Sequence, residues 1–165
     1  TGNGTSQHLA AELFKKMAGV NLLHVPYRGG APAIQDMVSG NCDMMFGNMP
    51  ECLGQIAGGG LVPVAFGSSP PSPLFPNVPT VAQTLPGFSV VNWFGIVGPR
   101  GLPAGLVATW NAALRKAVAK PEVQKRFVEN GMDTLMNSPD EMKKTIAADR
   151  AKWAEVIQGA GIRAD

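Results

Sequence analysis

The chain has 165 residues, of which 45% are hydrophobic and 16% are charged, and its formal net charge is +2. This composition is typical of a globular protein and excludes a charge-rich disordered chain. The small net charge, without any cluster of Lys and Arg, disfavours nucleic acid as a partner. No apolar run reaches the roughly 20 residues that a membrane-spanning helix needs.

The first 66 residues alternate between helical and strand-like patterns. Apolar residues recur with helical spacing in three segments, and short apolar runs lie between them. This order predicts an α/β lobe with a parallel sheet, whose ligands bind at the carboxyl ends of the strands and often at helix N-termini. The predicted helices are 5–18, 31–39 and the segment from Pro50 to the glycines at 58–60, and the predicted strands are 22–25, 42–46 and 61–66.

The pattern changes after residue 66. Residues 67–87 are rich in proline and poor in charge, which predicts a stiff, extended connector. A β-rich run follows at 88–97. The remainder has helical spacing, with Trp110 and Trp153 on apolar faces, where we expect them in a core. Helices are predicted at 103–119, at 121–130 and after a capping box formed by Ser138 and Glu141.

Cysteines and histidines do not indicate a metal or a cofactor. Two cysteines, Cys42 and Cys52, are too few for a disulfide scaffold, and we expect two free thiols. A bridge between them stays open, since it requires only Cα atoms within about 7 Å in an oxidising compartment. A zinc site at His8 and His24 is disfavoured, because no pair of ligands has the usual close spacing.

Several motifs occur together and in a recognisable order. They are Gly4–Ala10, His24–Ala33, Cys42–Pro50, Pro76–Ala82, Trp93–Gly95 and Pro99–Pro103. Each motif is weak alone, but the set resembles the Bug (TctC) family over essentially the whole chain. Members of this family are the substrate-binding proteins of tripartite tricarboxylate transporters.

The resemblance implies a fold like that of periplasmic binding proteins, with two α/β lobes that close on a ligand. Residues 1–90 would form the second lobe, with a parallel sheet. Residues 91–165 would form the interlobe crossing and the C-terminal helices of an incomplete first lobe. The family's N-terminal stretch, with its Gly-rich carboxylate loop and secretion signal, is not matched, and the chain opens on a loop-like run, so we expect an upstream portion.

The resemblance also implies a function. The expected protein is periplasmic, captures small carboxylates and delivers them to the membrane components of a tripartite tricarboxylate transporter. The alternative is an interaction or sensor-feeding protein of the same family without a transport role. An enzyme is disfavoured, because no nucleophile elbow, phosphate-binding loop or paired-carboxylate motif occurs. Self-association of the chain stays open.

Gly4, Thr5 and Ser6 open the first predicted helix. They are candidates for a carboxylate cradle, since N–H groups and hydroxyls meet there at the positive end of the helix. An ordinary N-cap explains the same residues, and both roles are compatible. His8 lies one turn into the helix, and we expect it to donate to the ligand or to a bridging water.

Two further candidate groups follow the first two predicted strands. Tyr27, Arg28 and Gly29 follow the first, where Arg28 could pair with a carboxylate and a solvated arginine is equally plausible. Asn48 follows the second strand as a possible ligand contact or turn residue. The family commonly has Asp at the position of Gly47, and its loss here would disfavour amino acids as ligands. Trp93, in the crossing, is a candidate for ligand contact, although packing at the hinge is the simpler role.

Overall fold

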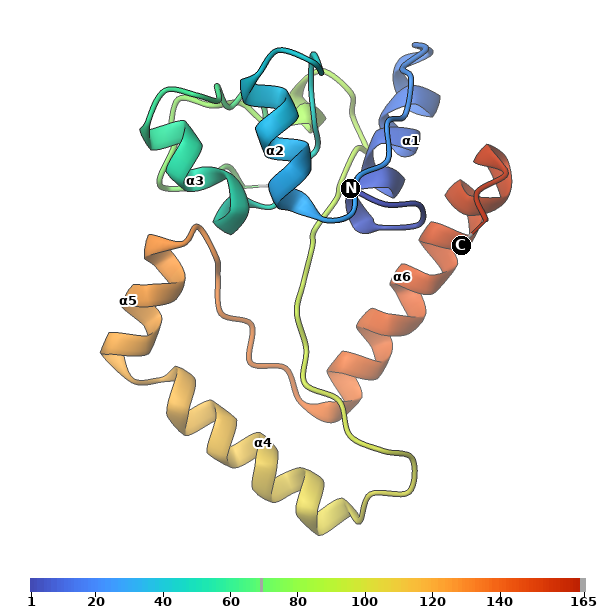
Figure 1. Cartoon of the computed structure of the whole chain (residues 1–165). Helices are drawn as coiled ribbons and strands as arrows, with labels where there is room; N and C mark the ends of the chain where they lie inside the picture. Colours follow the sequence, from blue (N-terminus) through green and yellow to red (C-terminus); the bar gives the residue numbers. More distant parts are fainter. Residues whose placement is uncertain (69, 164–165) are drawn as a thin grey trace. The chain divides into compact units, whose positions relative to one another are not determined.

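The computed structural model describes residues 1–68 and 70–163 (Figure 1). The chain divides into two compact units, which we describe separately. The first contains residues 1–92 and the chain from 153 onward, and the second contains residues 93–152. No helix within the described ranges has the length and apolar character required to cross a bilayer.

The first unit carries the helices that were predicted from periodicity. Thr5 is the N-cap of α1, Gly19 ends this helix in the left-handed region at φ 66°, and Pro50 lies in the first turn of α3. The helices of this unit are α1 (Ser6–Ala18), α2 (Gly30–Val38), α3 (Met49–Ala57) and the short η1 (Val81–Gln83).

The predicted parallel sheet is not confirmed. Within the described residues, the segments 22–25, 42–46, 61–66 and 88–97 have no strand assignment and are drawn as loops in Figure 1. An isolated parallel bridge joins Phe66 and Thr80. A strand needs a continuous ladder of hydrogen bonds to a neighbour as well as a suitable sequence. In the described part of the chain the pairing stays local, with backbone bonds at Phe66 and Val90 that do not extend into a ladder, and Leu23 is 91% exposed.

The first unit has a small core. Its buried apolar residues include Leu9 and Ala10 of α1, Ile34 of α2 and Val156 of α6 (Pro139–Ala160). The rings of Phe14, Phe46 and Phe88 pack together, with centroids 5.8, 6.2 and 6.3 Å apart in the three pairs. These aromatic contacts tie α1 to the segment before α3 and to the chain that follows residue 87.

The second unit is helical. It contains α4 (Ala104–Val118), α5 (Pro121–Glu129) and the first part of α6 (Pro139–Ala160), and α4 packs against α5. The predicted capping box is confirmed: the Ser138 N–H donates to Glu141 Oε2 at 2.7 Å, and the Glu141 N–H donates to Ser138 Oγ at 3.3 Å. The helix therefore begins where its sequence satisfies two backbone donors.

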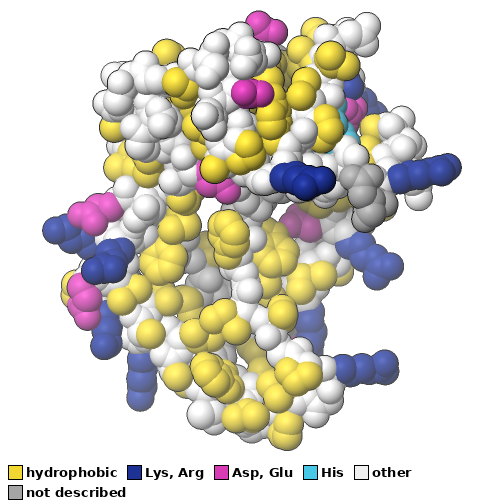
Figure 2. Space-filling view, viewed as in Figure 1, with side chains coloured by type: hydrophobic (Ala, Val, Ile, Leu, Met, Phe, Trp, Pro, Cys, Tyr) yellow, Lys and Arg dark blue, Asp and Glu magenta, His cyan; other side chains and the backbone are white. Residues whose placement is uncertain are grey.

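Apolar side chains remain exposed in the second unit. Trp110 is 58% exposed, so the prediction that it lies in a core is wrong for this structure. Figure 2 shows hydrophobic side chains at the surface around α4 and α5. The exposed large hydrophobic residues of this unit, here called the apolar surface, are Phe94, Ile96, Val97, Leu106, Trp110, Val128, Leu135 and Ile146.

Candidate functional site

The N-terminus of α1 forms a tight polar loop. Thr5 Oγ1 accepts from the His8 N–H at 3.4 Å and donates to the carbonyl of Gly2 at 2.8 Å. Gly4 has a φ of 73°, a conformation that favours glycine. The first turn of α1 contains no acidic residue, so no local carboxylate neutralises the positive end of the helix. The predicted N-cap is confirmed at Thr5, and Ser6 lies beside it, half-buried.

His8 holds this loop from inside. Its side chain is buried, and its Nδ1 accepts from the Gly4 N–H at 3.1 Å, which requires an unprotonated Nδ1. Its Nε2 lies 3.7 Å from Glu12 Oε1. The arrangement makes His8 a support of the Gly4–Thr5 loop through Nδ1, whereas sequence reasoning predicted that it donates to the ligand.

His24 stacks on His8 and was missed as a partner of the loop. The two ring centroids are 3.8 Å apart and the ring planes differ by 11°. Among the described residues, His24 Nε2 is buried without a hydrogen-bond partner. Burial, and then the neighbouring His8, lower the pKa of His24 below its usual value. The His24 ring therefore favours the neutral state.

The turn between Tyr27 and α2 is fixed by side-chain hydrogen bonds. Tyr27 Oη donates to Asp36 Oδ2 at 2.8 Å and lies 3.1 Å from Cys42 Sγ. The contacts with Cys42 and Asp36 raise the pKa of the Tyr27 hydroxyl, which stays protonated. Gly29 has a φ of 111° and its N–H donates to the carbonyl of Tyr27 at 2.9 Å. The Tyr27 hydroxyl is thus engaged within the protein, and Arg28 is exposed beside it.

Asn48 links two segments at the start of α3. Its Oδ1 accepts from Asn92 Nδ2 at 2.8 Å, and its Nδ2 donates to Glu51 Oε1 at 3.2 Å. The carboxylate of Glu51 lies against the first residue of α2: a Cβ placed on Gly30 would be 2.5 Å from Glu51 Oε2. Glu51 and Asn92 were not predicted. An acidic residue in the first turn of a helix is usual, and that common pattern concealed the role of Glu51.

These loops meet on one side of the first unit. A Cβ on Gly2 would lie 3.7 Å from the carbonyl of Tyr27, so the loop before α1 touches the turn before α2. Gly30 and Glu51 join that turn to the start of α3. We call residues 2–8, 27–30 and 48–51 the loop cluster. These contacts connect the three segments that carry the predicted ligand-binding residues of the first unit, and no contact with a ligand tests the prediction.

Trp93 belongs to the second unit. Its Nε1 donates to Asp149 Oδ2 at 2.6 Å, and its ring lies 3.4 Å from a Cβ placed on Gly95. Its indole N–H is therefore satisfied by α6. The structure leaves the predicted contact of Trp93 with a ligand untested.

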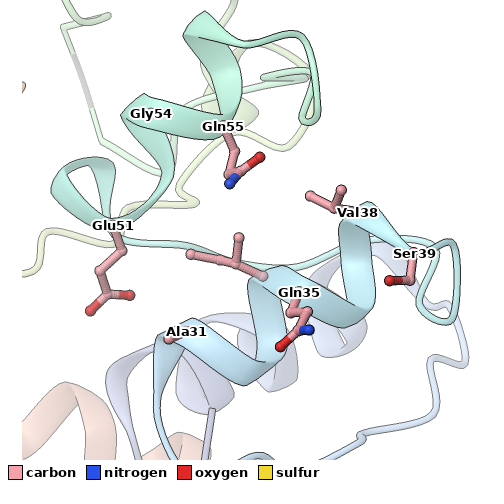
Figure 3. A pocket seen from close by; sticks show the side chains of 8 residues that line it. Ala31, Gln35, Val38, Ser39, Glu51, Gly54 and Gln55 are labelled. Atoms are coloured by element: carbon pink, nitrogen blue, oxygen red, sulfur yellow. The ribbon is translucent and has the colours of Figure 1, made fainter.

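A shallow groove of about 390 Å³ runs between α2 and α3 (Figure 3). Glu51 and Gln55 extend into it from α3, opposite α2. Among the predicted ligand residues none lines it, and Glu51 belongs both to the groove and to the loop cluster. The lining residues are Ala31, Ile34, Gln35, Val38, Ser39, Glu51, Gly54 and Gln55.

Within residues 1–68 and 70–163, no group of three or more His, Cys, Asp or Glu side chains could hold a metal ion. Cys42 and Cys52 are free thiols in this structure, and the bridge that was left open is not formed. Cys52 is buried, and burial raises the pKa of its thiol.

Comparison with known proteins yields a family match. The model of the tripartite tricarboxylate transporter family receptor (TctC) matches residues 1–162. A protein from the tcbD-tcbE intergenic region of a Pseudomonas strain is 36% identical over 94% of this chain and 47% of its own length. A protein from the clcB-clcD intergenic region of Pseudomonas knackmussii is 39% identical, over 94% of each chain. The chain thus spans about half the length of the first relative and nearly all of the second.

Two solved structures are similar to the chain. An R. palustris protein solved with adipate has a TM-score of 0.88 and 31% identity, over 96% of this chain and 54% of that one. The periplasmic binding protein BugD has a TM-score of 0.85 and 30% identity, over 97% of this chain and 55% of that one. The fold is thus that of about half of a periplasmic binding protein.

Proposed function

Because the chain belongs to the tripartite tricarboxylate transporter receptor (TctC) family, we propose that it is the ligand-binding part of a periplasmic protein that captures small carboxylates for such a transporter. The family is one of solute-binding proteins, so the proposal involves no catalysis. The observation that carries it is the convergence of three polar loops beside the acid-free N-terminus of α1. The adipate bound by the similar R. palustris protein supports a carboxylate ligand.

In this proposal the carboxylate binds at the loop cluster. Thr5 and Ser6 supply hydroxyls and the first N–H groups of α1 supply donors, which the positive end of the helix reinforces. Arg28 is exposed and, in the described part of the chain, forms no ion pair, so its guanidinium is available for a bidentate contact. His8 and Tyr27 hold the two loops in shape through Gly4, Asp36 and Cys42.

The lobe assignment is part of the same proposal. Residues 1–90 would be the second lobe, and residues 91–165 would be the crossing and the C-terminal helices of the first. The Pseudomonas relative from the tcbD-tcbE region is about twice as long as this chain. In such a relative, the additional residues would form the rest of the first lobe, on the other side of the ligand. Closure of two lobes about a hinge would then bury the ligand and present it to the membrane components of the transporter.

A thermal-shift screen tests the function on the protein in the form that its gene encodes. Mono-, di- and tricarboxylates should raise the melting temperature, by an amount equivalent to about 2.7 kcal/mol at a ligand concentration 100 times Kd. Stabilisation by nucleotides or metal ions, with none by any carboxylate, would contradict the proposal.

A double variant tests the location of the site. Thr5→Ala with Ser6→Ala removes two hydroxyls from the N-terminus of α1, and we expect the Kd of the best carboxylate to rise at least tenfold, measured by titration calorimetry. The matched control is Thr109→Ala, which removes a hydroxyl that donates to the carbonyl of Gly105 in the second unit. Equal affinities of the double variant and the control would remove these residues from the site.

A further inference from the structure

The carboxylate of Glu51 is the one acidic group of the loop cluster, and the proposed function does not use it. We propose that Glu51 determines the specificity of the site. The favoured ligands are small carboxylates with a hydrogen-bond donor, a hydroxyl or an ammonium group, next to the carboxylate. Small carboxylates with a second carboxylate at that position are disfavoured. This inference rests on the proposed function of the same site. It replaces the expectation, drawn from Gly47, that amino acids are disfavoured, because Glu51 would supply an acceptor for an ammonium group.

Glu51 is held in place although it is exposed. Asn48 Nδ2 donates to Oε1 at 3.2 Å, and Asn92 in turn donates to Asn48 Oδ1 at 2.8 Å. On the other side, Gly30 leaves room for the carboxylate, since a Cβ there would be 2.5 Å from Oε2 and 2.9 Å from Cδ. A positioned, solvent-accessible acceptor can bind a ligand donor without a large ordering cost.

The charges around this turn have opposite signs. Arg28 precedes the Gly29–Gly30 turn, and Glu51 lies against Gly30 on its other side. The Glu51 carboxylate also occupies the positive end of α2, which would otherwise attract an anion. A ligand carboxylate is therefore favoured near Arg28 and α1, whereas a second carboxylate beside Glu51 would meet a like charge. A hydroxyl or ammonium group there would donate to a charged acceptor, which gives a strong hydrogen bond.

A purely structural role for Glu51 predicts a different result. If its carboxylate only stabilised α2, neutralising it would weaken all ligands by the same factor. A specificity role predicts instead that the ratio between ligands changes. The decisive quantity is therefore the ratio of two dissociation constants, which a uniform loss of stability does not alter.

The experiment compares four three-carbon acids on the protein as its gene encodes it: propionate, lactate, alanine and malonate. Titration calorimetry should show lactate or alanine binding at least tenfold more tightly than malonate, and the stronger of the two identifies the preferred donor. Glu51→Gln should reduce this ratio at least tenfold. The control, Glu122→Gln, changes an exposed glutamate in the first turn of α5 and should leave the ratio unchanged.

The outcomes separate the two proposals. Absence of binding by every carboxylate would overturn the proposed function and this inference with it. Binding of carboxylates with malonate preferred by the wild-type protein, or with a ratio that Glu51→Gln leaves intact, would overturn the role of Glu51 alone. A preference of the wild-type protein for malonate would overturn the role of Glu51 even if the variant does not fold.

Discussion

At the residue scale, the stacked histidines link protonation to stability. The pKa of His24 is lowered chiefly by burial and then by the neighbouring His8, and Glu12 opposes this shift. The unfolded chain, with a usual histidine pKa of 6.5, therefore binds a proton more readily than the folded one. The stability that depends on a neutral His24 should be fully present above pH 6.5. It should be lost as the pH falls from that value toward the lower pKa of the folded state.

Urea denaturation at pH 7.5 and pH 5.5 measures this effect. The wild-type protein should lose stability at the lower pH, and His24→Phe, which cannot titrate and retains ring stacking on His8, should lose less. A loss of the same size in both proteins would assign the pH dependence to other groups.

The site residues show what a sequence can and cannot predict at this scale. Thr5 was predicted because N-caps have a strong local signature, and the structure places it as expected. Glu51, Asn92 and His24 were missed, because their roles arise from contacts with residues 16 to 44 positions away in the sequence. Such contacts leave no periodic pattern in the chain.

At the element scale, the helices follow from local chemistry. The capping box at the start of α6 also lowers the pKa of Glu141, through hydrogen bonds from the backbone and the hydroxyl of Ser138. Ser138→Ala should lower the free energy of unfolding by about 1 kcal/mol. Chemical denaturation should show Ser138→Thr, which keeps a capping hydroxyl, close to wild type. An unaffected alanine variant would mean that the cap contributes nothing.

The strands were predicted by the same reasoning and are not confirmed in the described residues. The difference is physical. A helix satisfies its own hydrogen bonds, so its sequence specifies it locally, whereas a strand depends on a neighbour that can be far away in the chain. Val62 and Val64 have the β-branched character of a strand, yet both are 80% exposed. Trp110 was wrongly placed in a core for a related reason, because an apolar helix face does not reveal what covers it.

At the scale of the whole molecule, the motifs were more informative than the elements. The resemblance to the TctC family, drawn from short segments, is confirmed by the family match over residues 1–162. Motifs retain the residues that a shared fold requires, and their order along the chain adds specificity that a single helix or strand pattern lacks. The division into lobes and the ligand contacts stay predictions.

The apolar surface of the second unit bears on how the isolated chain behaves. Ile96 and Val97 are 73% and 80% exposed, and exposed apolar groups of this kind favour association. We expect the sedimentation coefficient of the 165-residue chain to rise with concentration, and Ile96→Lys with Val97→Lys to reduce that rise. Lysine at two exposed polar positions of the second unit, Thr109 and Gln124, is the control. A wild-type chain that sediments as a monomer at all concentrations would contradict this expectation.

Tyr27 is the one tyrosine of the chain, and its hydroxyl is bonded inside the turn that carries Arg28. The tyrosine bands in an ultraviolet difference spectrum, as distinct from those of the three tryptophans, therefore come from a single known place. Any event that disturbs the turn, whether ligand capture or modification of the Cys42 thiol, would alter that signal directly. The protein thus contains its own optical reporter for the loop cluster, and no label has to be introduced.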